Sequence, residues 1–254
     1  DPDDKNNLPD HPNLVFIAAN FRYIKNHLRL HGAKKVDGIL ADLGVSSHQF
    51  DEGSRGFSIR FDGPLDMRMN PAIGISAEEV LTTYEEQALY DLFRKHTDLK
   101  SLKPLVHALL LARVQAPLKT TAELRELCEP LAPRGGWHKY VAQVFQGLRM
   151  EVNKELEVLE DLLNGCIDVL APGGRLVVMS YHSLEDRMVK NFIKEGKATG
   201  QTESDFFGVK RLPFKAITRK PVVATAEENA RNPRATSAKL RIAERSEHEW
   251  NRDE

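Results

Sequence analysis

The order of apolar and polar positions along the chain predicts a mixed α/β fold. Apolar runs predict buried strands over residues 13–18, 36–42 and 175–180, and two late strands near 216–223 and 238–243 that pair as a closing hairpin. Apolar residues at helical spacing predict helices over residues 21–30, 77–97, 99–115, 122–131, 139–170 and 184–195. The strand, helix, strand order from residue 13 to residue 42 predicts a right-handed parallel crossover.

A glycine-rich stretch after residue 50 interrupts this pattern. Glycines between residues 53 and 74 punctuate a polar and aromatic loop, helical segments follow, and Pro133-Arg134-Gly135-Gly136 marks the return. This is too much material for an ordinary loop. We therefore predict an all-helical insertion domain over residues 50–137, set into a discontinuous α/β domain formed by residues 1–49 and 138–254.

The strand over residues 36–42 ends in Asp42, and a Gly/Ser turn follows it. Such a strand delivers a carboxylate to the carboxyl edge of a parallel sheet, where open α/β sheets bind ligands. Taken alone, the stretch is explained better as a core strand whose Asp42 caps the next element.

A second strand leads to the same predicted edge. It follows a helix and Pro172-Gly173-Gly174, an order typical of the back half of a class I methyltransferase sheet, and it ends in Ser180-Tyr181-His182-Ser183. Ser183 and Asp186 are spaced like a capping box at the start of the next helix. We expect the turn after Asp42 and the turn at His182 to meet across one crevice, with the arginine-rich loop of the insertion over it.

Composition narrows the function classes. The chain has 254 residues, of which 41% are hydrophobic and 29% charged, enough for one large domain or a domain with an insertion. No apolar run is long enough for a membrane span and no leader is visible, so we expect a cytoplasmic protein. Cys128 and Cys166 lack metal-ligand spacing and are expected in the core. The formal net charge of −1 hides basic clusters at residues 22–35 and 231–245, so an RNA partner is not excluded.

Long motifs recur along most of the chain. They are Asp37-Gly38-Ile39-Leu40-Ala41-Asp42-Leu43-Gly44-Val45-Ser46-Ser47-His48-Gln49, Arg55-Gly56-Phe57-Ser58, Asp62-Gly63-Pro64-Leu65-Asp66-Met67-Arg68-Met69, Phe145-Gln146-Gly147-Leu148-Arg149, Ser180-Tyr181-His182-Ser183-Leu184-Glu185-Asp186-Arg187 and Asn232-Pro233-Arg234. Together they resemble the signature of the bacterial 16S rRNA cytosine-N4 methyltransferase family.

The resemblance implies methylation, with S-adenosyl-L-methionine, of the exocyclic amine of a cytidine in the decoding centre of the small ribosomal subunit. It also implies a Rossmann-like catalytic domain interrupted by a helical substrate domain. The family's cofactor contacts correspond here to Phe21, Asp42 and Gln49. Without the family, Gln49 is interpreted as a solvated loop residue. Asp42 is a cofactor contact first, and an acceptor for the target amine as a further hypothesis.

Two residues at the predicted sheet edge have alternative roles. His182 either bonds the target base or its phosphate, with a catalytic role, or pins its own turn. Tyr181 either stacks on the flipped base or packs in the interior. No Gly-x-Ser-x-Gly elbow supports a hydrolase, and no His/Cys/Cys spacing supports a zinc deaminase or another metal site.

Cations elsewhere suit an RNA substrate. Arg55 and Arg68 lie in the glycine-rich loop and are predicted to contact phosphate, whereas Phe57 and Phe61 are predicted to pack the loop onto the core. Arg234, just before the last strand, is predicted to touch RNA near the active edge.

The chain also departs from the family pattern. The first strand and its Gly-rich cofactor loop would precede Asp1, which matches an acid two residues beyond the one that holds the ribose, and His96-Thr97-Asp98 replaces a common Tyr-Gly-Glu. We therefore expect residues 13–18 and 36–42 not to be neighbouring strands, because a central strand belongs between them. Either upstream residues exist, or the fragment is rearranged or pairs with another chain. Cofactor binding by residues 1–254 should be weak.

Two alternatives to this function stay open. One is a catalytically inactive RNA-binding or assembly factor. The other is a methyltransferase for a different small-subunit rRNA cytosine.

Overall fold

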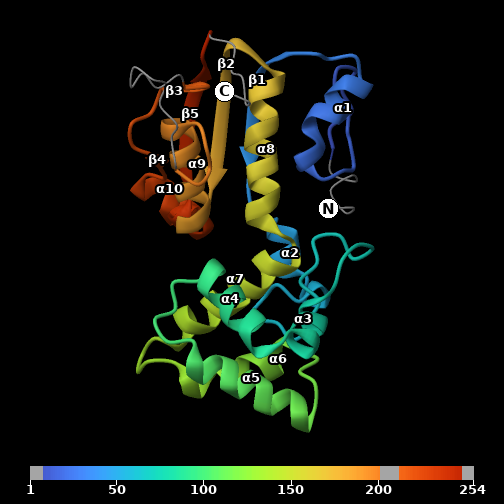
Figure 1. Ribbon diagram of the computed structural model, residues 1–254, viewed down its shortest axis with the longest axis vertical. Coiled ribbons are helices and arrows are strands. Elements are labelled where there is room, and N and C mark those ends of the chain that lie inside the picture. The colour runs from blue at the N-terminus through green and yellow to red at the C-terminus, as the bar shows by residue number, and fades with distance from the viewer. Residues whose placement is uncertain (1–7, 201–211, 248–254) are drawn as a thin grey trace. The chain divides into compact units, whose positions relative to one another are not determined.

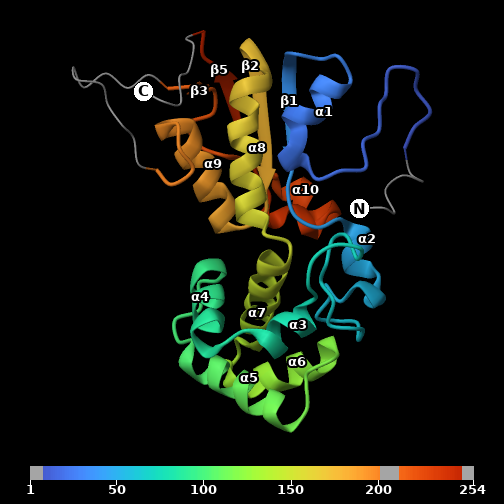
Figure 2. The same cartoon turned by 45° about the vertical axis from the view of Figure 1, so that its right-hand side comes forward.

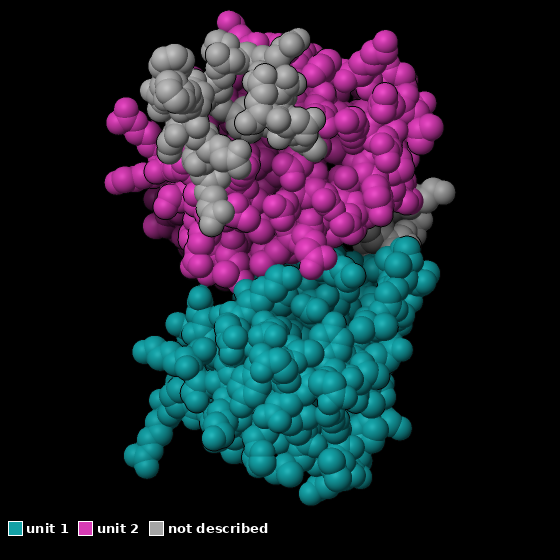
Figure 3. All heavy atoms as spheres, in the orientation of Figure 1, with its two compact units in different colours: residues 1–8, 45–155 teal, residues 9–44, 156–254 magenta. Residues whose placement is uncertain are grey.

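The computed structural model describes residues 8–200 and 212–247, and Figure 1 shows the order of their helices and strands. Asp1, whose match to the family is predicted above, lies outside the described residues. The chain divides into two compact units, coloured separately in Figure 3. Unit 1 includes residues 45–155, and unit 2 includes residues 9–44, 156–200 and 212–247 of the described chain.

Unit 2 is built on a mixed sheet with the strand order β1-β2-β5-β3, in which β4 also pairs with β5. The strands are β1 (Val36–Asp42), β2 (Leu170–Ser180), β3 (Phe214–Ala216), β4 (Val222–Val223) and β5 (Lys239–Arg245). β1 and β2 are parallel, with Asp42 opposite Met179, and β5 is antiparallel to β2, β3 and β4. The predicted late hairpin is confirmed as antiparallel pairing, although its first strand is two short ones.

Two helices pack on one face of this sheet. Figure 1 shows α8 (Glu155–Val169) and α9 (Ser183–Glu195) over the same face. Their apolar residues form one core with the inward residues of β2, including Leu163 and Cys166 from α8 and Phe192 from α9. Burial raises the pKa of the Cys166 thiol to about 12, so this cysteine is a neutral core residue, as predicted. The parallel strand pair with helices packed on the sheet confirms the α/β class.

The predicted strand over residues 13–18 is wrong. In the structure this segment is irregular, Val15 is 60% exposed, and local turn bonds join Leu14 N to His11 O and Ala19 N to Ile17 O. A strand needs a neighbour for its backbone donors and acceptors, and here the segment pairs with none of the described strands. The predicted crossover therefore does not form, and β1 is an edge strand with α1 (Ile24–Leu30) beside it (Figure 2).

Unit 1 is mainly helical and has its own core. Its helices are α2 (Ser47–Asp51), α3 (Ala77–Thr83), α4 (Glu86–His96), α5 (Lys103–Gln115), α6 (Thr121–Cys128) and α7 (Trp137–Val152). The core includes Phe93 from α4, Leu109 from α5, Leu124 from α6 and Leu148 from α7. Unit 1 contains the whole predicted insertion, residues 50–137, together with α7. The assignment of separate catalytic and substrate domains stays a prediction.

Two long predicted helices are each broken in the structure. The one over residues 77–97 is α3 and α4, separated at Tyr84 and Glu85, whose backbones are extended. The one over residues 139–170 is α7 and α8, separated where Lys154 adopts a φ of 51°. The apolar repeat continues through both breaks, so periodicity alone could not locate them. In the described part of the chain no helix is both long and apolar enough to cross a membrane.

Candidate functional site

The candidate site lies where β1 and β2 end. The two strands are parallel, so their carboxyl ends meet at one edge of the sheet. The backbone N–H of Leu43 donates to the carbonyl of Met179 (3.0 Å), which keeps the chains together beyond Asp42. Two residues after Met179, the Tyr181 hydroxyl donates to Asp42 Oδ1 at 2.8 Å. The prediction that these two turns meet is confirmed.

Tyr181 is held from both its backbone and its side chain. Its backbone N–H donates to Glu185 Oε2 (3.0 Å), and Glu185 is a buried carboxylate in the first turn of α9. Burial, followed by the hydrogen bond to Asp42, raises the pKa of Tyr181 to about 12. The phenol therefore stays protonated and acts as a donor near neutral pH.

His182 begins α9 as its N-cap residue. Its Nδ1 accepts a long hydrogen bond from the backbone N–H of Glu185 (3.5 Å), and its Nε2 lies 3.2 Å from Glu185 Oε1. The imidazole is 11% exposed. These contacts belong to the role of pinning the turn, and the role at the base or phosphate stays a prediction.

The predicted cap at Ser183 and Asp186 is wrong, because Ser183 is already the first helical residue. The carboxylate of Asp186 instead accepts two hydrogen bonds from Arg241 of β5, 2.7 Å from Nε and 3.2 Å from Nη2. Burial alone would raise the pKa of Asp186, but these bonds and the charges of Arg241 and Lys239 outweigh it and lower the pKa. The pair fastens the start of α9 to the sheet, and nothing local in the sequence indicates it.

Phe21 and Gln49, two predicted cofactor contacts, belong to different units. Phe21 starts a short 3₁₀ turn before α1 and is 43% exposed, so its ring is accessible. Gln49 is 3% exposed, so the alternative of a solvated loop residue is wrong. Its Oε1 accepts from the backbone N–H of Ser46 (3.1 Å), and its own N–H donates to Ser46 Oγ (3.2 Å), which completes a capping box for α2.

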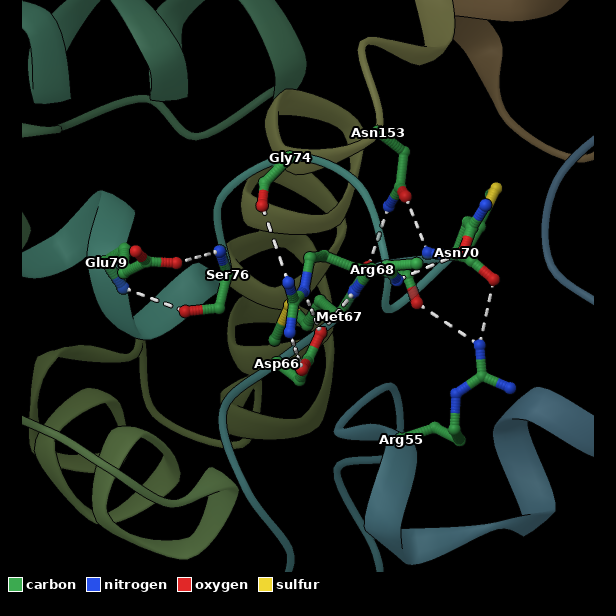
Figure 4. Close-up of polar contacts among 11 residues, drawn as sticks. Arg55, Asp66, Met67, Arg68, Asn70, Gly74, Ser76, Glu79 and Asn153 are labelled. Carbon is green, nitrogen blue, oxygen red and sulfur yellow. Dashed lines mark hydrogen bonds and ion pairs between the residues drawn. The ribbon is translucent and has the colours of Figure 1, made fainter. Parts of the chain in front are cut away.

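Arg55 and Arg68 organise the glycine-rich loop of unit 1, as Figure 4 shows. The Arg68 guanidinium donates to both carboxylate oxygens of Asp66 (2.8 and 2.7 Å). Arg55 donates to the carbonyls of Arg68 (3.2 Å) and Met69 (2.9 Å). Both arginines thus stabilise the loop, and their contact with RNA stays a prediction.

The same loop contains a strained residue. Met67 is fully buried and has a φ of 61°, which is unusual for a bulky side chain. The Asn153 side chain fixes the loop backbone on both sides of Arg68. Its Oδ1 accepts from Met69 N (2.7 Å), and its Nδ2 donates to Met67 O (2.7 Å). Phe57 packs into the unit 1 core, whereas Phe61 is half exposed.

His96, which belongs to the segment that departs from the family pattern, takes part in a hydrogen-bond network of unit 1. His96 is buried, and its Nε2 lies 2.9 Å from Glu151 Oε2, while Tyr84 donates its hydroxyl to Glu151 Oε1 (2.9 Å). The hydrogen bond with His96 is the largest cause of a lowered pKa at Glu151. His96 therefore links α4 to α7.

Arg234 precedes the last strand of unit 2. It belongs to a 3₁₀ turn, Pro233–Ser237, and is exposed. The following strand β5 starts at Lys239, which pairs with Ser180 at the end of β2. The register therefore leads this basic segment to the edge where Asp42 and Tyr181 meet.

Comparisons with known proteins agree with this fold. A model of the MraW methylase family matches residues 4–246. The chain is 49% identical over 245 residues to the ribosomal RNA small subunit methyltransferase H of Bacteroides fragilis, covering 96% of this chain and 81% of that protein. It is 52% identical over 234 residues to the protein of the same name from Cytophaga hutchinsonii, covering 92% and 78% respectively. The chain therefore belongs to the MraW methylase family, whose members are Rossmann-like methyltransferases.

Proposed function

We propose that this protein methylates the N4 amine of a cytidine in the decoding centre of 16S rRNA, with S-adenosyl-L-methionine as methyl donor. The observation that supports it most is the carboxylate of Asp42, held by Tyr181 at the carboxyl edge of the sheet in a chain of this family. Relatives named as small-subunit rRNA methyltransferases support the substrate class. Because the proposed substrate is part of the bacterial small ribosomal subunit, we propose that the reaction takes place in the cytoplasm.

The residues at the edge suit the methyl donor. Asp42 is exposed, and its carboxylate oxygens can accept hydrogen bonds from ribose hydroxyls or an ammonium group. The exposed ring of Phe21 offers an apolar surface for the adenine. When bound, the donor supplies an electrophilic methyl group on a sulfonium. We also propose that Gln49 contacts it, on the motif match alone.

The main contribution required of the protein is to align the cytosine amine with the methyl group. The lone pair of the cytosine amine is delocalised into the ring, which makes it a poor nucleophile. Transfer therefore requires the amine to be held in line with the methyl group, at about 3 to 3.5 Å. A carboxylate acceptor on the amine stabilises the positive charge that develops during attack. We propose Asp42 for this second role as well, and His182 for a bond to the base or its phosphate.

Cations near the site suit the RNA. We propose that Arg234 contacts phosphate beside the active edge, since it is exposed and its segment leads to that edge. Arg55 and Arg68 would add positive charge through the loop that they hold.

Methylation of small subunits tests this function. We expect the purified protein to transfer labelled methyl from S-adenosyl-L-methionine to small subunits that lack the modification, at one cytidine of the decoding centre. Asp42→Asn should reduce the rate at least about 10-fold, because an amide is a weaker acceptor for a developing cation. Asp37→Asn, an exposed acid at the other end of the same strand, is the matched control and should leave the rate unchanged.

The outcomes separate the alternatives. Label at another small-subunit cytosine would replace the proposed position. Subunit binding without transfer by the wild-type protein would favour an RNA-binding or assembly factor. Full turnover by Asp42→Asn would contradict the amine-acceptor role.

A further inference from the structure

Asp42 is an exposed side chain at the end of an edge strand, a place where a carboxylate usually samples several rotamers. Here one of its oxygens is engaged, because the Tyr181 hydroxyl donates to Oδ1 at 2.8 Å. A hydrogen bond to an ionised acceptor is among the stronger ones in proteins. The hydroxyl of Tyr181 thus orients the Asp42 carboxylate.

Tyr181 is itself fixed by its surroundings. The buried carboxylate of Glu185 accepts from its backbone N–H at 3.0 Å. Gly44 lies beside its ring, since a Cβ at that glycine would stand 3.7 Å from Cδ2 of Tyr181. Gly44 also has a φ of 89°, which a side chain would strain, so the turn after Asp42 is shaped to run past this ring. The buried Glu185 thus holds the backbone of Tyr181, and the hydroxyl of Tyr181 in turn holds the exposed Asp42.

We propose that Tyr181 is a positioning residue, which holds the Asp42 carboxylate in the orientation that binds the methyl donor. This inference rests on the proposed function, because it deepens the role of Asp42 there. In this role Tyr181 acts through its hydroxyl, which donates to Asp42. Base stacking and interior packing, the two roles left open for Tyr181 by the sequence, would both use the ring.

Tyr181→Phe separates these roles, because phenylalanine keeps the ring and lacks the hydroxyl. Calorimetry with S-adenosyl-L-methionine should show the Kd rising about 10-fold, the factor expected for losing one hydrogen bond to a charged group. In methyl transfer, KM for the methyl donor should rise by the same factor, while KM for small subunits changes less than about 2-fold. Loss of stacking would instead raise KM for small subunits, and only in Tyr181→Leu.

A double-mutant cycle tests whether Tyr181 acts through Asp42. If it does, Tyr181→Phe in an Asp42→Asn background should weaken binding less than about 2-fold further, since the partner is already changed. Tyr84→Phe is the matched control, because it removes the same kind of bond, from a phenol to Glu151 Oε1 at 2.9 Å, in unit 1. It should leave the Kd for the methyl donor unchanged.

Each result decides between the possibilities. Wild-type Kd in Tyr181→Phe, or additive losses in the cycle, would overturn the inference. Tight donor binding without methyl transfer would contradict the proposed function. The Kd values of the variants would then still test the positioning role of Tyr181. Binding by residues 1–254 is expected to be weak, so the titration extends to high donor concentration, and a wild-type chain that binds no donor even there would overturn both. Thermal unfolding of both Tyr→Phe variants shows whether a changed Kd reflects lost folding.

Discussion

At the scale of single residues, the site is stabilised by ion pairs that cross between elements. Arg241 of β5 donates to Asp186 at the start of α9, and both side chains are largely buried. Together with the bond from Tyr181 to Asp42, this pair sets where the turn after β2 lies. Asp42, Tyr181 and His182 could be identified from the sequence, because each follows a strand pattern. Arg241 could not, since its partner is 55 residues away.

The Asp186 pair should make stability depend on pH. The folded pKa of Asp186 is below its ordinary value of 3.8, so its contribution is complete above that pH and is lost as the pH falls through the folded pKa. Asp186→Asn should lower the free energy of unfolding by about 2 kcal/mol near neutral pH, because Arg241 loses its charged partner. Urea unfolding at several pH values should show the difference from wild type shrinking below pH 3.8.

Asp91→Asn is the control for this measurement. Asp91 forms an exposed pair with Arg94 (3.3 Å) within one helix. Such pairs contribute little, so this variant should follow the wild-type pH profile. A difference at Asp186 that stays constant into acid would contradict the linkage argument.

At the scale of elements, α4 and α7 approach each other closely at Gly147. A Cβ there would lie 2.8 Å from Thr97 Cγ2 and 3.2 Å from Phe93 Cδ1, and both neighbours are buried. The resemblance includes this glycine in a motif but does not say why it is glycine. The structure supplies the reason, which is the packing of two helices far apart in sequence.

Gly147→Ala should therefore destabilise unit 1. Alanine favours a helix interior by up to about 1 kcal/mol over glycine, but overpacking against Thr97 and Phe93 costs about 1 to 3 kcal/mol, so the clash should win. Gly165→Ala in α8 is the matched control, since among the described residues its Cβ would meet only one methyl group, the Cγ2 atom of Ile24 at 3.0 Å. Urea unfolding should show the larger loss for Gly147→Ala, and equal losses would contradict the packing argument.

At the scale of the whole molecule, the described chain forms two units with separate cores, and the sheet of unit 2 has unequal strands. β2 is paired on both sides, whereas β1 pairs with β2 alone among the described strands. Leu40 of β1 is 71% exposed, an unusual place for leucine in a strand. An edge of this kind has backbone groups without ladder partners.

Hydrogen exchange should report this difference. We expect peptides covering residues 36–42 to exchange faster than peptides covering residues 175–180, because unpaired amides of an edge strand open to solvent more readily. Mass spectrometry of the free protein measures both in one experiment, with β2 as the internal reference. Equal protection of the two strands would show that the β1 edge is covered in solution.

The sequence by itself determined which residue types stand at the ends of β1 and β2. The local sequence is enough to recognise an apolar run that ends in an acid before glycine. It is also enough to recognise the family's motifs, the α/β class and most helices. Sequence could not locate the breaks at Tyr84 and Lys154, because the apolar repeat continues across them. It also predicted a strand over residues 13–18, where the propensity is present but none of the described strands pairs with the segment.

Only the tertiary structure decided what those terminal residues do to one another. The hydroxyl of Tyr181 reaches Asp42 across 139 positions of sequence because β1 and β2 pair in parallel with Asp42 opposite Met179. A shift of one residue in that register would turn one of the two side chains to the other face of the sheet. Local pattern specifies the groups, and strand register, a property of the whole fold, specifies their contact.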